Sequence, residues 1–278
     1  MIKKLPSEIV TRFAPSPTGA LHLGHVYSAL FARNWADRHD GEMRLRIDDI
    51  DFTRCQDQFT DLIFDDLAFL GIHFDGEVMV QSKRQDRYQS ALKYLEDQEF
   101  IYPCTLTRRA LNELLSAPHG GNMIIRNTDK FKRGDEDISL NNTAWRLRMD
   151  NIIKSIPTLS YTEWGGGNSG QEIPIDLERL DDVVVARKDI GTSYHLSVVL
   201  DDADSNVNVV TRGKDLEEST LIHRLLQTLL GLDETVWAHH ALITDNDGKR
   251  LAKRDSAQSI QFFRQSGLTA EEIIRKIS

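Results

Sequence analysis

A strand that runs into a proline-rich turn and then a long helix is the feature that most restricts how this chain can fold. Residues 9–13 begin as a short strand, and Pro15 and Pro17 stop it because proline disfavours helix at the residue before it. Apolar residues then recur at helical spacing over residues 22–38, and Gly41 follows as a stop signal. The segment therefore predicts a strand, a rigid extended turn and a helix in close succession.

The remaining pattern predicts an α/β fold. A strand over residues 42–51 that ends in carboxylates precedes two helices, at 57–70 and 84–99, and this order favours a parallel sheet. Residues 106–180 are turn-rich around an alternating strand at 144–149, which indicates an insertion. The later part of the chain is expected to form buried strands at 181–187, 193–203 and 208–216, a helix at 217–230, a loop and a helical tail from 258.

Composition excludes several classes of protein. The chain has 278 residues with no apolar run near the ~20 that a membrane-spanning helix needs, and its first ten residues lack the apolar region of a secretory signal. Cys55 and Cys104 do not form a disulfide framework, which fits a reducing compartment. The net charge of −9 does not favour a polyanion partner, although a local basic face could still bind one. We expect a cytoplasmic monomer.

Two histidines open the first helix. His22 and His25 lie three residues apart, hence on one side of the first turn, where a helix N-terminus suits a phosphate. Gly19 allows a close backbone approach, and Gly24 leaves room for a flat ring. Spacing alone is equally compatible with two ordinary surface histidines. A zinc helix is disfavoured because the spacing is not i,i+4 and no glutamate follows.

A second constellation is the basic loop GKRLAKRDSA at residues 248–257. Its cations, Arg250 and Lys253 among them, could stabilise charge that develops on a phosphate in a transition state. Taken alone, the loop could equally be a solvated basic segment.

The two segments together resemble the signature sequences of class I aminoacyl-tRNA synthetases. HLGH at 22–25 resembles the HIGH motif, and RLAKR at 250–254 resembles the KMSKS loop. RFAPSPTGALHLGH, RIDDID and VTRGKDL are similar to the glutamyl branch, and the resemblance covers nearly the whole chain. Only residues 255–278 follow the loop, so we expect no anticodon-binding domain. The match is therefore nearest the stand-alone glutamyl-queuosine tRNA(Asp) synthetase family.

This resemblance implies a Rossmann-like parallel sheet with a connective α/β insertion and a short C-terminal helical tail. The implied boundaries are 1–105 and 181–240 for the two halves of the catalytic domain, 106–180 for the insertion, and 241–278 for the KMSKS-like loop and tail. The implied activity is ligation: L-glutamate is activated by ATP with Mg²⁺, without need of tRNA, and is then transferred to the queuosine base in the anticodon of tRNA(Asp).

The resemblance also implies roles for individual residues. Catalysis is assigned to Lys253, His22 and His25, and ATP binding to these three together with Gly24 and Arg250. Arg12 and Arg212 end predicted strands, where open α/β sheets bind ligands, and match arginines of the family's glutamate pocket. A structural ion pair is the alternative role for either arginine. The implied glutamate-binding residues are Arg12, Phe13, Ala14, Pro15, Ser16, Asp48, Tyr194 and Arg212.

Three departures from the family pattern have consequences. Asp48, expected to hold the α-amino group, stands where many relatives have glutamate, and Ala252 replaces a serine of the KMSKS loop. Some relatives bind zinc through several cysteines, whereas only Cys104 and a possible His119 remain here, so we predict no structural zinc and no other metal site. Two other functions stay open: a truncated glutamyl-tRNA synthetase that acylates the 3′ end of tRNA(Glu), and a non-catalytic tRNA-binding paralogue.

Overall fold

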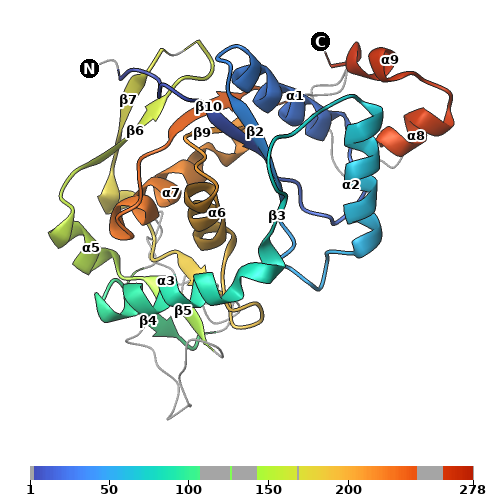
Figure 1. Cartoon of the computed structure of the whole chain (residues 1–278). Coiled ribbons are helices and arrows are strands. Elements are labelled where there is room, and N and C mark those ends of the chain that lie inside the picture. Colours follow the sequence, from blue (N-terminus) through green and yellow to red (C-terminus); the bar gives the residue numbers. More distant parts are fainter. Residues whose placement is uncertain (1–2, 107–125, 127–142, 168, 243–258, 278) are drawn as a thin grey trace, which may run out of the picture.

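The computed structural model describes residues 3–106, 126, 143–167, 169–242 and 259–277. Its central element is a mostly parallel sheet in two halves; in Figure 1 the first half is blue to teal, and the second half is yellow-green and orange. The first half has the order β1-β2-β3, with β1 at Val10–Phe13, β2 at Glu42–Ile47 and β3 at Met79–Val80. The connecting helices are α1 (Leu23–Asp37) and α2 (Asp57–Phe69).

The second half has the order β7-β6-β10-β9. β9 (Val209–Gly213) and β6 (Leu159–Glu163) both pair in parallel with β10 (Val236–His240), and β7 (Gln171–Ile175) pairs antiparallel with β6. The crossover from β9 to β10 is α7 (Glu217–Leu229). β6 therefore belongs to the central sheet, although it lies within the stretch that the sequence indicates as an insertion. The domain boundaries stay a prediction.

The two halves meet between β1 and β9. Asn208, just before β9, donates from its backbone N–H to the carbonyl of Val10 (3.1 Å), and its side-chain oxygen accepts from the Val10 N–H (2.9 Å). Its amide nitrogen donates to the carbonyl of Glu8 (2.6 Å). The combined order β3-β2-β1-β9-β10-β6 is that of a doubly wound sheet, whose direction of winding reverses between β1 and β9. The predicted Rossmann-like α/β fold is confirmed.

A smaller antiparallel sheet packs below this layer in Figure 1. It has the order β4-β5-β8, with β4 at Ile101–Cys104, β5 at Ala144–Leu147 and β8 at Val184–Ala186. The remaining helices are α3 (Gln85–Asp97), α5 (Met149–Ser155), α6 (Tyr194–Asp204), α8 (Ile260–Gln265) and α9 (Ala270–Ile274), with 3-10 turns at Gln81–Arg84, Leu177–Arg179 and Lys214–Leu216. None of the described helices is long and apolar enough to cross a lipid bilayer.

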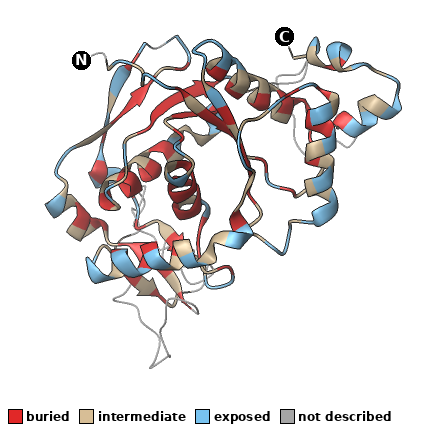
Figure 2. Ribbon diagram, viewed as in Figure 1, coloured by how far each residue is buried: buried red, intermediate tan, exposed pale blue. Residues whose placement is uncertain are grey.

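Two large hydrophobic clusters form most of the core, and a small third cluster joins Ile9 before β1 to Val209 of β9 and Ala238 of β10. One large cluster packs α1 and α2 against β1 and β2 and includes Ile260 and Ile273 of the tail helices; Arg264 of the tail also pairs with Asp66 of α2, so the predicted tail packs onto the first half of the domain. The other packs α3, α6 and α7 together with the strands of the second half and of the small sheet. Buried residues accordingly concentrate on the central strands and on α6 (Figure 2).

The predicted strand at 193–203 is wrong, because this segment forms α6. Its apolar run LSVVL, at residues 196–200, is buried at every position, and a short continuous apolar run has no period that distinguishes a strand from a buried helix. Ser193 caps the helix, and its hydroxyl accepts from the Leu196 N–H (3.3 Å). Strand β10 was not predicted, and β8 joins the small antiparallel sheet.

Candidate active site

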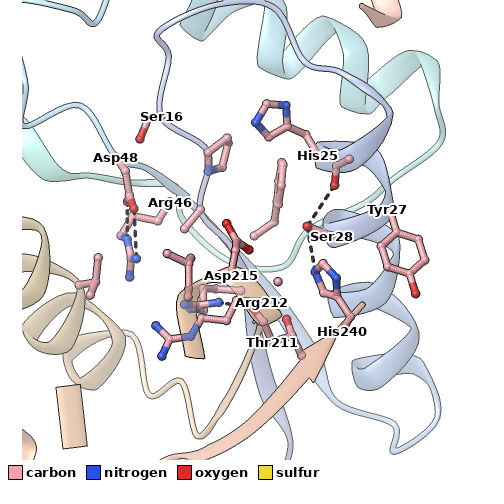
Figure 3. A pocket seen from close by; sticks show the side chains of 18 of the residues that line it. Ser16, His25, Tyr27, Ser28, Arg46, Asp48, Thr211, Arg212, Asp215 and His240 are labelled. Carbon is pink, nitrogen blue, oxygen red and sulfur yellow. Dashed lines mark hydrogen bonds and ion pairs between the residues drawn. The ribbon is translucent and has the colours of Figure 1, made fainter. Parts of the chain in front are cut away.

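The carboxyl ends of the central strands and the start of α1 enclose a pocket of about 590 Å³ (Figure 3). This pocket lies where the winding of the sheet reverses, the place at which open α/β sheets bind ligands. Every predicted site residue that the structure describes lines it: Arg12, Phe13, Ala14, Pro15, Ser16, His22, Gly24, His25, Asp48, Tyr194 and Arg212. Segments far apart in the sequence are therefore brought together as expected.

The two histidines form the N-terminal cap of α1. His22 Nδ1 accepts from the Gly24 N–H (3.1 Å), and His25 Nδ1 accepts from the His22 N–H (3.1 Å), which makes a reciprocal capping box. A neutral ring whose Nδ1 accepts carries its hydrogen on Nε2. Both rings, with centroids 3.8 Å apart, thus carry an Nε2–H, so a phosphate at this helix start would meet imidazole donors rather than these two backbone N–H groups.

Gly24 is required by this arrangement. A Cβ at this position would lie 2.9 Å from Cε1 of His22 and 3.1 Å from its Nδ1. The flat ring that packs against the glycine backbone is therefore the ring of His22 itself, and any larger residue would push it out of its capping position.

The predicted catalytic Lys253 and its neighbour Arg250 lie outside the described residues. The described residues on either side of that segment do reach the pocket: Leu242 lines it, and Ser259 forms a β-bridge with His22. Ile260 also donates its N–H to the carbonyl of Leu21 (2.9 Å). The roles of Lys253 and Arg250 stay predictions.

A buried cluster of arginines and aspartates forms the floor of the pocket. The Nε of Arg12 donates to Asp202 (3.1 Å) and its Nη1 to the carbonyl of Thr211 (2.7 Å). Arg46 pairs with Asp48 (2.6 Å) and with Asp202. Burial opposes ionisation of Asp202, but the charges of Arg12 and Arg46 hold its pKa below the usual value. Arg12 thus has both roles that the sequence left open, since it is ion-paired and it lines the pocket.

Arg212 differs from the other two arginines because only neutral groups hold it. Its Nε donates to His239 Nε2 (3.3 Å), its Nη1 to His223 Nδ1 (3.0 Å) and its Nη2 to the hydroxyl of Thr220. In the part of the chain that the structure describes, no carboxylate forms an ion pair with it, although it is only 5% exposed. Burial and the nearby charge of Arg12 lower its pKa. A buried cation in this state favours an anionic ligand.

The carboxylate of Asp48 is already hydrogen-bonded to Arg46. Arg46 donates to both of its carboxylate oxygens, at 2.6 and 3.4 Å, as the dashed lines in Figure 3 show. Burial raises the pKa of Asp48 to about 6, with Arg46 opposing the shift and Asp201 and Asp202 adding to it. Its carboxylate still lines the pocket, and the backbone N–H of Asp48 donates to the carbonyl of Pro15 (3.0 Å).

A second pocket, of about 750 Å³, adjoins the first and shares Ser16, Asp48 and Tyr194 with it. Tyr194 is 38% exposed, and its ring contacts those of His195 and His223. The site therefore has two compartments that meet at the predicted glutamate-binding residues.

Several pocket residues were missed from the sequence. Arg46 lines the pocket and pairs with the buried Asp202 behind it, while Tyr27, Ser28 and His240 line the pocket beside the histidine pair. The Ser28 hydroxyl lies 3.0 Å from His240 Nε2, and Tyr27 packs edge-on against the same ring. Ser28 and Tyr27 could have been found, because they follow His25 on α1 by three and two residues. His240 could not, since β10 itself was not predicted.

No metal centre is evident in the described residues, which include no group of three histidine, cysteine or acidic side chains arranged to hold an ion. Cys104 is buried on β4, and His119 lies outside the described residues. The predicted absence of structural zinc therefore stays a prediction.

Comparison with known proteins assigns the family. The family described as tRNA synthetases class I (E and Q), catalytic domain, matches residues 8–278. A Glutamyl-Q tRNA(Asp) synthetase from Rhodobacter capsulatus is 43% identical over 97% of this chain and 99% of its own length. A glutamate–tRNA ligase from Dichelobacter nodosus is 34% identical over 96% of this chain, which spans 56% of that relative.

A solved structure agrees with these matches. The crystal structure of a glutamate tRNA ligase from Elizabethkingia meningosepticum in complex with its amino acid is similar with a TM-score of 0.74 and 26% identity. The similarity covers 89% of this chain and 52% of that one. This chain therefore belongs to the class I tRNA synthetases (E and Q), as a catalytic domain of that family.

Proposed function

We propose that this protein activates L-glutamate with ATP to form glutamyl-adenylate, without need of tRNA, and transfers the glutamyl group to the queuosine base in the anticodon of tRNA(Asp). The observation that carries the proposal is Arg212, a buried cation that only neutral groups hold, in the same pocket as the Nε2–H donors of His22 and His25. One pocket thus offers complements to a carboxylate and to a phosphate.

The charges of the first pocket suit glutamate, which has two carboxylates and one ammonium. Arg212 offers its charge to one carboxylate, and among the described residues Nη2 of Arg12 makes no hydrogen bond and can serve the other. Asp48 is placed to accept the ammonium, next to the extended segment that includes Ser16.

In the first step, an oxygen of the glutamate α-carboxylate attacks the α-phosphorus of ATP, and the bond to the β-phosphate breaks to release pyrophosphate. This step needs alignment and charge stabilisation rather than a protein nucleophile. The two imidazole donors would hold phosphate oxygens, Lys253 and Arg250 would meet the developing charge, and Mg²⁺ would arrive with ATP.

In the second step, a hydroxyl of the queuosine ring attacks the carbonyl carbon of the mixed anhydride and AMP leaves with the bonding pair. The second pocket gives this acceptor access, because it opens onto Ser16, Asp48 and Tyr194. The proposal that queuosine in tRNA(Asp) is the acceptor rests on the 43% identity to a Glutamyl-Q tRNA(Asp) synthetase, which this chain matches over almost the whole length of that relative. Four glutamate–tRNA ligases among the relatives are 29–34% identical, and this chain spans 55–58% of their length.

The test has two stages. Pyrophosphate exchange into ATP is measured with glutamate, with and without tRNA, and exchange without tRNA is expected. Labelled glutamate is then offered with tRNA(Asp) that contains queuosine or guanosine at the same position, each with a 2′,3′-dideoxy terminus. Label on the queuosine form alone is expected. Label on tRNA(Glu) with an intact terminus would support the truncated synthetase instead, and absence of all exchange would support the non-catalytic paralogue.

A further inference from the structure

Glu163, at the end of β6, is a buried carboxylate that is hydrogen-bonded to His239 on the neighbouring strand β10 and to the nearby Gly165 N–H. It is 3% exposed, and its Oε1 accepts from the backbone N–H groups of His239 (3.0 Å) and Gly165 (2.6 Å). Its Oε2 lies 2.6 Å from Nδ1 of the His239 ring. Burial opposes ionisation, but these hydrogen bonds hold the pKa of Glu163 below its usual value. Glu163 does not line the candidate pocket.

The hydrogen bonds fix which nitrogen of His239 carries the hydrogen. An ionised carboxylate can only accept, so Nδ1 of His239 is the donor to Glu163. On the other side of the ring, Nε2 faces the Nε–H of Arg212 (3.3 Å) and the hydroxyl of Thr220 (3.1 Å). An arginine N–H can only donate, so Nε2 must present its lone pair. Both sides of the ring therefore require the same tautomer.

We propose that Glu163 is a positioning residue for glutamate binding, which acts through His239 to hold the guanidinium of Arg212 in its binding orientation. This proposal rests on the proposed function, because it takes the carboxylate of glutamate as the ligand of Arg212. The chain of contacts is Glu163 to His239 to Arg212, and only Arg212 reaches the pocket.

The indirect arrangement has a physical advantage over a direct ion pair. A carboxylate in contact with Arg212 would neutralise the charge that the substrate needs, whereas the lone pair of a neutral imidazole orients the guanidinium and leaves its charge. His223 acts similarly from the other side through its Nδ1, and burial together with the charge of Arg212 lowers the pKa of His223, which keeps that ring neutral.

Gly165 packs tightly against both Glu163 and His239. A Cβ on Gly165 would lie 2.3 Å from the backbone N and O of His239 and 2.6 Å from Oε1 of Glu163. Only glycine lets its own N–H approach the carboxylate while the strand packs this closely. A side chain at position 165 would therefore force the carboxylate and the His239 backbone apart.

Glu163→Gln tests the proposal because it reverses the polarity of the relay with little change of shape. The amide oxygen can keep the two backbone hydrogen bonds, which leaves the amide NH₂ facing Nδ1 of His239. Nδ1 must then accept, the hydrogen moves to Nε2, and that hydrogen faces the N–H of Arg212. Two donors in contact would displace the guanidinium.

The experiment combines kinetics with ¹⁵N NMR of histidine-labelled protein. Glu163→Gln is expected to raise the KM for glutamate about tenfold or more, since a donor is left without its acceptor, with the KM for ATP changed less than twofold. The ¹⁵N shifts of His239, assigned with His239→Gln, should show the hydrogen transferred from Nδ1 to Nε2. An unchanged tautomer, or an unchanged KM for glutamate, would overturn the proposal.

Two further variants keep the test decisive. Asp182→Asn removes another buried carboxylate, which accepts from Tyr102 and from the Met149 N–H away from the pocket, and it should leave both KM values unchanged. Glu163→Asp keeps the charge and should fall between wild type and Glu163→Gln, so it also serves if Glu163→Gln does not fold. Equal losses for glutamate and ATP in Glu163→Gln would indicate a purely structural role. Wild-type protein without glutamate-dependent exchange would refute the proposed function, whereas the tautomer measurement would still test the relay.

Discussion

At the scale of single residues, the three buried arginines of the pocket differ in the groups that balance their positive charge. Arg46 pairs with three aspartates and Arg12 with one, whereas Arg212 has neutral acceptors only. Burial of a compensated ion pair and burial of a lone cation have different energetic consequences, because removing one partner of a pair leaves the other charge uncompensated. The same substitution should therefore act differently at the two kinds of position.

Arg212→Met should change the free energy of unfolding of the unliganded protein by no more than about 1 kcal/mol, because relief of a buried charge offsets the lost hydrogen bonds. Arg46→Met should cost about 3–5 kcal/mol, because Asp48 and Asp202 lose their shared partner. Urea denaturation measures both. Glutamate should raise the Tm of the wild type but not of Arg212→Met, and an equal loss of stability in the two variants would contradict this assignment of charges.

The pKa of Asp48 predicts a pH dependence of glutamate binding. With a pKa of about 6, the carboxylate is mostly protonated at pH 5 and mostly ionised at pH 7. If it binds the ammonium of glutamate, the KM for glutamate should fall about tenfold between these pH values, which follows from the ionised fraction. Pyrophosphate exchange over this range provides the measurement. Asp48→Asn should have a high KM with no such step, and a wild-type KM that is flat with pH would refute the role.

The raised pKa of Asp48 has the opposite pH dependence for stability: it favours folding at low pH. The unfolded chain releases the Asp48 proton near pH 3.8, whereas the folded protein keeps it until about pH 6. The folded state therefore binds more protons in this window, so the contribution of Asp48 to stability is present below the lower value and is lost as the pH rises through the window. Asp48→Asn should remove this loss, which unfolding curves at pH 4 and pH 7 can measure.

At the scale of elements, the two histidines at the N-terminus of α1 have both a structural and a chemical role. His22 and His25 cap the helix through Nδ1, and this fixes Nε2 as the donor that faces outward from the cap. Asparagine can also cap a helix, but it lacks an imidazole donor at that reach. The two roles can therefore be separated by choice of substitution.

His22→Ala should lose about 1 kcal/mol of stability through the lost cap, whereas His22→Asn should keep most of it. Both variants should raise the KM for ATP by a similar factor, because neither supplies the Nε2–H. Chemical denaturation and pyrophosphate exchange with varied ATP give the two readouts. If His22→Asn restored ATP binding along with stability, the histidine would be a cap and nothing more.

The helices and strands also show which parts of the fold could be predicted from the sequence alone. The strand–turn–helix unit of residues 9–38 was predictable because proline, glycine and helical periodicity act locally. Helix α6 was not, since its apolar run at residues 196–200 is buried at every position and its three aspartates find their partners far away in the chain, Asp202 with Arg12, Asp201 with Gln81 and Asp204 with Arg84. The relay from Glu163 to Arg212 was hidden for the same reason, because only the pairing of β6 with β10 brings these residues together.

At the scale of the whole molecule, the site depends on the junction between two half-sheets. Arg12 ends β1 and Arg212 ends β9, so the two arginines keep their relative position only if these strands stay aligned. Asn208 supplies two side-chain hydrogen bonds across the junction, to Val10 and Glu8 at the start of β1, and Arg12 supplies another, to the carbonyl of Thr211 on β9. Of these two residues only Arg12 lines the pocket, so Asn208 can affect glutamate affinity only by keeping the two strands aligned.

Asn208→Ala should lower stability by about 1–2 kcal/mol, since it leaves the Val10 N–H without its side-chain acceptor, and should raise the KM for glutamate severalfold. The matched control is Asn151→Ala, which removes a side-chain hydrogen bond to the carbonyl of Glu99 (3.2 Å) in a part of the molecule that does not line the pocket. The control should leave the KM for glutamate unchanged. Saturating glutamate contacts both halves, so it should restore more stability to Asn208→Ala than it adds to the control. Equal gains in stability in the two variants would mean that the arginines that bind glutamate do not help to hold the two halves together.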